Sequence, residues 1–148
     1  MKKLTLLVAI VLFVNLYGFS QSKSDTLAIK QVIERESTTW RNGDMKGHAD
    51  CWKIQPYSRI LVSTADGKFY DIPPQMMATP SAKSNGVGGS SSNSDYKIGI
   101  VGNSAWASFN EESIAKDGQK SYTIEIKILE KINGDWKIVA LSVHGYNK

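Results

Sequence analysis

The 148-residue sequence contains one cysteine, Cys51, and no block of basic residues. A lone cysteine excludes a disulfide within the chain, and we expect Cys51 to be a small buried side chain rather than a reactive thiol. Lys and Arg number 18 against 14 acidic residues. Because these basic residues are dispersed, the composition gives little support for nucleic-acid binding.

The chain also lacks the short motifs of several enzyme classes. It contains no GxSxG sequence, P-loop, HExxH helix or dinucleotide-binding fingerprint. Its two histidines and single cysteine do not have the spacing of metal ligands. We therefore expect no metal and no other cofactor.

Residues 1–20 have the organisation of a removable export signal: two lysines, an apolar run over 4–16, and small residues before Gln21. The apolar run is shorter than the ~20 residues of a membrane-spanning helix. We predict cleavage before Gln21, export to the periplasm or the exterior, and no stable membrane anchor. An uncleaved anchor is the alternative.

Residues 21–148 are long enough for one domain with its own core. Within them, residues 81–94 (SAKSNGVGGSSSNS) are polar and rich in Gly and Ser. This composition predicts a flexible loop. Two interpretations stay open: a mobile loop beside a pocket mouth, or an insertion without a role.

Helical patterns precede strand patterns along the chain. We predict a helix from an N-cap at Asp25 to Asn42, ended by Gly43, and a second helix over 44–52. A further helical turn is expected over 75–79. Strands are predicted over 58–64, 69–72, 95–101, 104–115, 120–132 and 136–146. This order predicts an α+β domain.

Two turn sequences, Asp117-Gly118 and Asn133-Gly134, predict two-residue hairpin loops. With such loops, Ile124, Ile126 and Ile128 face the helices together with Tyr122. The opposite face then carries an apolar patch, a surface for a second copy of the chain: Trp106, Leu129, Trp136 and Ile138. One extra residue at the second turn would exchange the faces of the last strand.

Glu36 lies within a helical apolar stripe formed by Ile29, Val32, Ile33 and Trp40. Burial of a lone carboxylate is costly, so such a group finds a partner, becomes protonated or faces a wet cavity. This stripe predicts a hollow domain with a polar group inside.

Three segments together resemble the nuclear transport factor 2-like superfamily, in its SnoaL-like branch: residues 34–52 (ERESTTWRNGDMKGHADCW), 102–109 (GNSAWASF) and 129–144 (LEKINGDWKIVALSVH). The resemblance implies a cone-shaped α+β fold, in which a strongly bent antiparallel sheet wraps around N-terminal helices. It also implies a pocket at the wide end and, as in many members, dimerisation through the outer sheet face.

The family contains isomerases, dehydratases, cyclases and non-catalytic binding or association domains. Relative to the ketosteroid isomerases, Glu36 falls where those enzymes place an oxyanion-stabilising tyrosine. Their general base falls near Leu61 or Val62, which cannot carry a proton. The paired histidines of many SnoaL-like proteins are absent, since Ala140 and Ser142 follow Trp136.

We predict a site in which Glu36 and Glu111 are the catalytic candidates. Two carboxylates in a dry cavity repel each other, so one of them would hold a proton for acid–base chemistry. The alternative is that each is bonded by a backbone group or a basic side chain and has a structural role. The predicted pocket lining is Glu36, Trp40, His48, Trp52, Tyr57, Phe109, Glu111 and Tyr122.

Three functions remain open from the sequence. The first is an exported domain that binds a small apolar or carbonyl-bearing molecule without catalysis. The second is an isomerase, dehydratase or cyclase that uses Glu36 as acid or base. The third is a homodimeric association domain.

Overall fold

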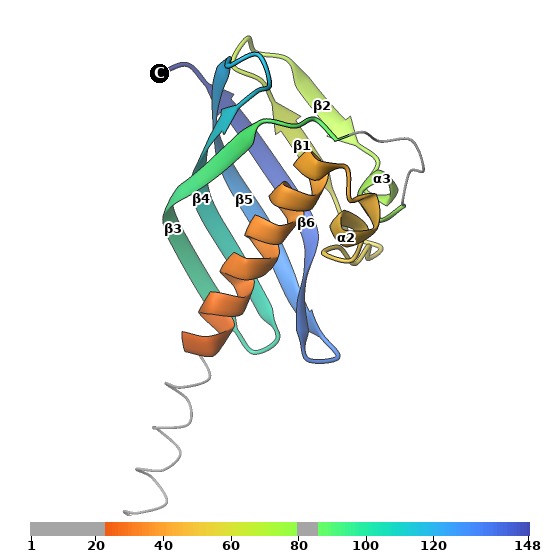
Figure 1. Ribbon diagram of the computed structural model, residues 1–148. Helices are drawn as coiled ribbons and strands as arrows, with labels where there is room; N and C mark the ends of the chain where they lie inside the picture. The colour runs from red at the N-terminus through yellow and green to blue at the C-terminus, as the bar shows by residue number, and fades with distance from the viewer. Residues whose placement is uncertain (1–22, 80–85) are drawn as a thin grey trace, which may run out of the picture.

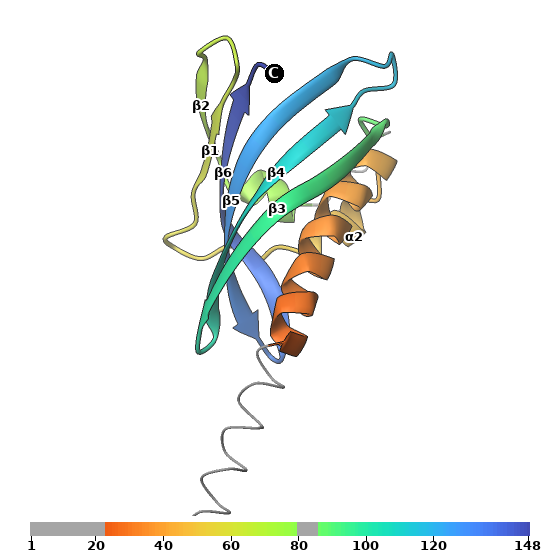
Figure 2. The ribbon, with the colours of Figure 1, turned by 90° about the vertical axis from the view of Figure 1, so that its left-hand side faces the viewer.

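The computed structural model describes residues 23–79 and 86–148, in which a long helix lies across one face of a six-stranded sheet (Figures 1 and 2). The sheet has the order β2-β1-β6-β5-β4-β3. The strands are β1 (Ile60–Ser63), β2 (Phe69–Ile72), β3 (Ser90–Val101), β4 (Ser104–Ile114), β5 (Lys120–Ile132) and β6 (Asp135–Tyr146). Two short helices, α2 (Met45–Ala49) and α3 (Gln75–Ala78), complete the α+β arrangement.

The N-terminal helix is continuous from residue 23, the first described residue of this segment, to residue 42. Ile29 and Ile33 are fully buried against the sheet, and Glu36 on the same face is 7% exposed. Asp25 is not the predicted N-cap, because it lies inside the helix and its side chain bonds Lys131 and Trp136. No helix in the two described segments is long and apolar enough to cross a membrane.

The corner after this helix agrees with the sequence prediction. Gly43 has φ +76° and ends the helix, since its lack of a Cβ permits this left-handed conformation. Asp44 then caps α2 by accepting a hydrogen bond from the Gly47 backbone nitrogen at 2.8 Å. α2 ends at Ala49, earlier than predicted, and Trp52 instead bridges to Ile138.

The sheet is mixed and not strongly curled, so the purely antiparallel, strongly bent sheet that the resemblance implied is corrected. β1 runs parallel to β6, with Ile60 opposite Leu141. Hairpin turns impose an antiparallel direction only on consecutive strands. Because β1 and β6 are far apart in the chain, no turn fixes their relative direction.

The register between β4 and β5 differs by one residue from the prediction. Asp117 does not have a positive φ, as a two-residue type I′ loop requires, whereas Gly118 has φ +85°. The Ala115 backbone nitrogen donates to the Gln119 carbonyl oxygen at 2.9 Å, which closes a three-residue loop over 116–118, and the Gly118 backbone nitrogen donates to the Ala115 carbonyl oxygen at 3.0 Å. Ser108 therefore pairs with Ile126, and Phe109 pairs with Glu125.

The turn between β5 and β6 is the predicted two-residue loop, because Asn133 and Gly134 both have positive φ. Leu129 pairs with Ile138, but Ile128 pairs with Ala140. Val139 is thus an extra residue in β6, a β-bulge that shifts the rest of the strand by one position.

These two shifts reverse the predicted orientation of β5. Glu125, Lys127 and Leu129 face the helix, and the isoleucines at 124, 126 and 128 are 39–43% exposed on the outer face. The predicted outer patch is therefore wrong in part. Trp106 is 46% exposed, but three members are buried in the core: Leu129, Trp136 and Ile138.

Other sequence predictions have mixed outcomes. Cys51 is 1% exposed, and burial raises the pKa of its thiol to about 11, as expected of an unreactive core residue. The predicted loop over 81–94 is wrong at its end, since residues 90–94 belong to β3. Positions 80–85 and the predicted signal at 1–20 lie outside the described residues.

Candidate functional site

Glu36 is bonded inside the domain to a lysine that sequence reasoning missed. Its Oε2 atom accepts a hydrogen bond from Lys127 Nζ at 2.6 Å, and its Oε1 atom accepts one from Trp52 Nε1 at 3.3 Å. Lys127 comes from β5 and is 2% exposed. The N-terminal helix and the sheet are therefore joined by a buried ion pair.

Both members of this pair are charged. Burial alone would raise the pKa of Glu36, but the charge and hydrogen bond of Lys127, with His48 and Trp52, hold it below the usual value. Burial alone would lower the pKa of Lys127, but the carboxylates around it, Glu36 first, raise it. Glu36 is thus a fixed anion and a poor proton donor.

Glu125 is a second carboxyl beside Lys127. Its Oε2 atom lies 3.4 Å from Lys127 Nζ, and the residue is 8% exposed. Burial raises the pKa of Glu125, Lys127 opposes this change only in part, and the charges of Glu111 and Glu36 add to it. Glu125 is therefore the group around Lys127 that most readily holds a proton.

Glu111, the other predicted catalytic candidate, has its own cation. Arg41 Nη2 donates to its Oε1 atom at 3.1 Å, and Ser113 Oγ donates to the same atom at 2.6 Å. Ser37 Oγ lies 3.4 Å from Oε2. Glu36 and Glu111 are thus paired with different cations, so the predicted sharing of one proton between them has no geometric support.

His48 is held by a backbone carbonyl. Its Nδ1 atom lies 3.2 Å from the Glu36 carbonyl oxygen and 3.7 Å from Glu36 Oε1. Because a carbonyl only accepts hydrogen bonds, Nδ1 carries a hydrogen. The Nε2 atom is buried and has no hydrogen-bond partner among the described residues, and the ring packs 5.1 Å from that of Trp40.

These groups surround one cavity of about 240 Å³, called the Glu36 cavity below. Its polar lining consists of Glu36, Ser37, Arg41, His48, Glu111, Glu125 and Lys127. Its apolar lining consists of Trp40, Met77, Val87 and Leu141. The volume is below the roughly 300–1,000 Å³ typical of drug-sized ligands, so it suits a small molecule.

The predicted pocket residues separate into three groups. Glu36, Trp40, His48 and Glu111 line the cavity. Trp52 and Phe109 are buried beside it, and Lys127 Nζ lies 5.7 Å from the Phe109 ring centre. Tyr57 and Tyr122 lie elsewhere: Tyr57 is 63% exposed and donates to Glu130, and Tyr122 packs on Tyr146.

Arg41, Glu125 and Lys127 were not predicted as site residues. In β5, charged residues at 125 and 127 alternate with isoleucines at 124, 126 and 128. The rule that apolar side chains face the core predicts that the isoleucines point inward and the charged residues point outward, which is the reverse of the observed orientation. The sequence feature that predicts a residue such as Lys127 is the buried position of Glu36, because a buried carboxylate requires a buried cation.

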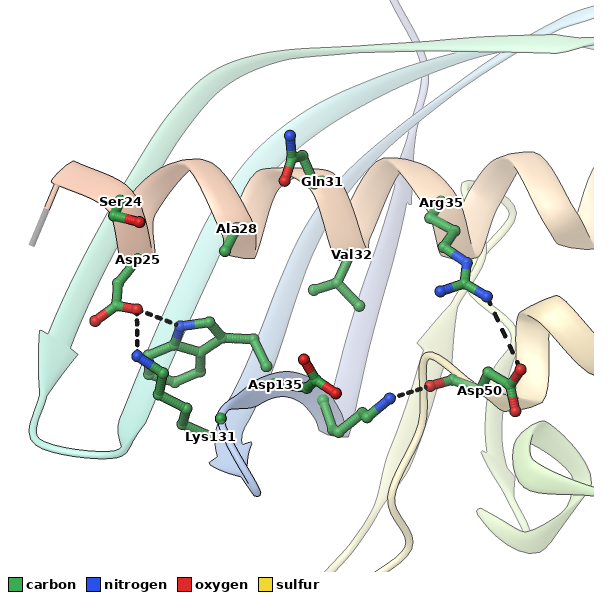
Figure 3. A pocket seen from close by; sticks show the side chains of 12 residues that line it. Ser24, Asp25, Ala28, Gln31, Val32, Arg35, Asp50, Lys131 and Asp135 are labelled. Atoms are coloured by element: carbon green, nitrogen blue, oxygen red, sulfur yellow. Dashed lines mark hydrogen bonds and ion pairs between the residues drawn. The ribbon is translucent and has the colours of Figure 1, made fainter. Parts of the chain in front are cut away.

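A larger groove of about 490 Å³ lies between the N-terminal helix and the β5–β6 turn (Figure 3). Within it, Lys131 Nζ and Trp136 Nε1 both donate to Asp25, at 2.6 and 3.0 Å. Arg35 lies 3.9 Å from Asp50, and both side chains are about half exposed. The charged side chains of this groove neutralise one another in water. The Glu36 cavity is therefore the better candidate site, although its volume is smaller.

Among the residues of the two described segments, no group of three or more His, Cys, Asp or Glu side chains is placed to hold a metal ion. Lys127 and Arg41 already pair with Glu36 and Glu111, two of the three carboxyls of the Glu36 cavity. The chemistry available there is ionic and hydrogen-bonding recognition, with one protonatable carboxyl.

No protein-family model matches the sequence, and no curated protein matches it significantly. Solved structures do match. An NTF2-like protein of unknown function from Shewanella baltica is 18% identical, with a TM-score of 0.58 over 84% of this chain and 96% of that chain. An NTF2-like protein with a cystatin-like fold from Novosphingobium aromaticivorans is 13% identical, with a TM-score of 0.67 over 88% of each chain.

A third match is an NTF2-like protein from Cytophaga hutchinsonii, 17% identical, with a TM-score of 0.59 over 79% of this chain and 94% of that chain. Likeness at this level of identity shows the fold and no activity. The resemblance predicted from the sequence is confirmed at the level of the fold: the chain has the NTF2-like, cystatin-like fold.

Proposed function

We propose that this protein binds a small organic molecule in the Glu36 cavity and that this cavity is the pocket at the wide end of an NTF2-like cone. One observation carries the proposal: five ionisable side chains from the helix and the sheet line one cavity. A buried ion pair is often no more stabilising than well-packed apolar residues. Such a costly set of charges in a small core therefore favours a binding role.

The apolar lining supports the same proposal. Trp40, Met77, Val87 and Leu141 offer contact to a hydrocarbon body, while the charged groups offer orientation. Small-molecule sites usually combine an apolar wall with a few placed polar groups. The ligand is thus a small molecule with an apolar part and one polar end.

Native mass spectrometry of the protein purified from its own host tests this proposal. We expect a retained small molecule that is lost on denaturation. Trp40→Ala removes part of the cavity wall and should reduce retention, and the matched control Trp106→Ala on the outer face should not. A protein that retains nothing, or retention unchanged in Trp40→Ala, contradicts the proposal.

The alternative is an isomerase, dehydratase or cyclase with Glu36 as acid or base. A general base works best when its pKa lies near the working pH. Because Lys127 and Trp52 bond the two oxygens of Glu36 and its pKa is lowered, the geometry favours binding over catalysis by Glu36.

A second function, self-association through the outer sheet face, is supported by a separate observation. Four large apolar side chains on β4 and β5 are 39–46% exposed: Trp106, Ile124, Ile126 and Ile128. Exposed apolar side chains grouped on one face mark interaction surfaces. We propose that this face, called the isoleucine face below, contacts the same face of a second copy.

Export is a further proposal, supported by the sequence of residues 1–20 alone. N-terminal sequencing of the protein from its host should give a chain that begins at Gln21. A mature chain that retains residues 1–20 contradicts export by signal cleavage.

A further inference from the structure

The charged groups of the Glu36 cavity do not balance. Three carboxyls line it, Glu36, Glu111 and Glu125, against two permanent cations, Arg41 and Lys127. Each cation has one close carboxylate partner, at 3.1 Å for Arg41 with Glu111 and 2.6 Å for Lys127 with Glu36. Within the described part of the chain, Glu125 is therefore the one carboxyl of the three that has no cation of its own.

The bonding of the three carboxyls shows the same imbalance. Glu36 accepts a further hydrogen bond from Trp52, and Glu111 accepts one from Ser113. Among the described residues, Glu125 has only the 3.4 Å contact with Lys127, whose nearer partner is Glu36. A buried carboxylate with so little compensation is unfavourable.

Glu125 shares the cavity with five other titratable or charged groups. Lys127 is on its own strand, Glu111 comes from β4, Glu36 and Arg41 come from the N-terminal helix, and His48 comes from α2. Two of these are carboxylates, and together with burial they outweigh Lys127 and raise the pKa of Glu125. The surplus carboxyl therefore holds a proton more readily than an ordinary glutamate does.

This inference rests on the proposed binding function. We propose that the ligand is a small organic cation, an ammonium with a short apolar body. Its charge takes the place of the proton on Glu125. The ammonium donates to the carboxylate, and the displaced proton leaves to solvent. The hydrocarbon body lies against Met77, Val87 and Leu141.

Trp40 fits the same ligand. Its indole lines the cavity and is 37% exposed. The face of an indole ring attracts an organic cation electrostatically. An anion or a neutral alcohol carries no positive charge to replace the proton on Glu125, so neither ligand compensates the third carboxyl.

Calorimetric titration with three ligands of matched size tests the inference: butylammonium, 1-butanol and butyrate. At pH 7 we expect butylammonium to bind about tenfold or more tightly than the other two. Its affinity should rise with pH while Glu125 loses its proton, and proton release should appear as a dependence of the heat on the buffer's ionisation enthalpy.

Glu125→Gln keeps the shape of the side chain and removes its charge. It should weaken butylammonium binding by about tenfold or more and leave 1-butanol binding unchanged. Glu112→Gln, on the same sheet but outside the cavity, is the matched control and should change neither. Urea unfolding of Glu125→Gln confirms that the variant is folded.

The outcomes separate the two proposals. If 1-butanol or butyrate binds as well as butylammonium, or if Glu125→Gln leaves butylammonium binding unchanged, the cation inference fails and the binding function stands. If none of the three binds at millimolar concentration, both fail.

Discussion

Lys127 is the residue that joins the helix to the sheet by charge. It lies between Glu36 at 2.6 Å and Glu125 at 3.4 Å and is almost fully buried. Removal of one member of a buried pair leaves an uncompensated charge, which is more destabilising than loss of the pair as a whole. This asymmetry distinguishes Lys127 from the exposed lysines of the chain.

Lys127→Met should lower the free energy of unfolding by about 3–5 kcal/mol at pH 7, because Glu36 would remain buried without its cation. Urea denaturation measures the change. The double variant Glu36→Gln/Lys127→Met should recover part of the loss. Lys120→Met, which breaks an exposed pair with Glu112, is the control and should have a much smaller effect. Equal effects of the two single lysine variants would contradict the buried-pair interpretation.

The pH dependence of stability should report Glu125. Its pKa is raised in the folded state, so the folded protein binds more protons than the unfolded chain between the ordinary glutamate pKa of 4.5 and the folded pKa. Stability from this group therefore falls as pH rises through that window. Glu36 has the opposite sign, because its lowered pKa adds stability above 4.5 that is lost on acidification.

Glu125→Gln removes the first of these two effects. Its stability relative to the unsubstituted protein should increase from pH 4 to pH 8, as measured by urea unfolding at each pH. A difference that is constant over this range would show that Glu125 titrates normally.

At the level of elements, two turns of similar sequence have different geometry. Asn133 has φ +53° in the loop between β5 and β6, whereas Asp117 does not have a positive φ. A left-handed conformation costs an alanine roughly 1–2 kcal/mol. Each turn therefore responds differently to the same substitution.

Asn133→Ala should destabilise the protein by roughly 1 kcal/mol, and Asn133→Gly should not. Asp117→Ala should cost less, because it removes only the hydrogen bond from the Gln119 backbone nitrogen. Thermal unfolding of the three variants measures the differences. Equal losses for Asn133→Ala and Asp117→Ala would contradict the three-residue loop.

These turns explain which parts of the fold the sequence predicts. The strand positions apart from the start of β3, the Gly43 corner and the inward position of Glu36 follow from local patterns, and the structure confirms them. The orientation of β5 does not follow from local patterns, because the loop at Asp117 has one residue more than predicted and β6 has a bulge at Val139. Lys127 and Glu125 were missed because of these register shifts and because their alternation with isoleucines favours the opposite face.

At the scale of the whole molecule, the N-terminal helix lies on one side of the sheet (Figure 2). The exposed isoleucines of the isoleucine face alternate along β5 with the buried Glu125, Lys127 and Leu129, so they lie on the other side. An isologous pair of such faces would bury these isoleucines in a dimer with two-fold symmetry. The Glu36 cavity lies on the helix side of the sheet, so binding and association use separate surfaces.

Ile126→Lys should convert a dimer into a monomer, because it places a charge at the centre of the isoleucine face. Analytical ultracentrifugation measures the mass. Leu27→Lys, at a 58% exposed position on the N-terminal helix across the sheet from this face, should leave the dimer intact. An unsubstituted protein that sediments as a monomer at high micromolar concentration would exclude the proposed association.

The central claim is that the cavity holds one surplus carboxyl with a raised pKa beside a fixed ion pair. Carbon-detected NMR titration of the glutamate side-chain carboxyls tests it most directly, with Glu125→Gln and Glu36→Gln used for assignment. We predict that the pKa of Glu125 lies above the ordinary glutamate value of 4.5 and that the pKa of Glu36 lies below it. Titration of both carboxyls together near 4.5 would contradict the claim.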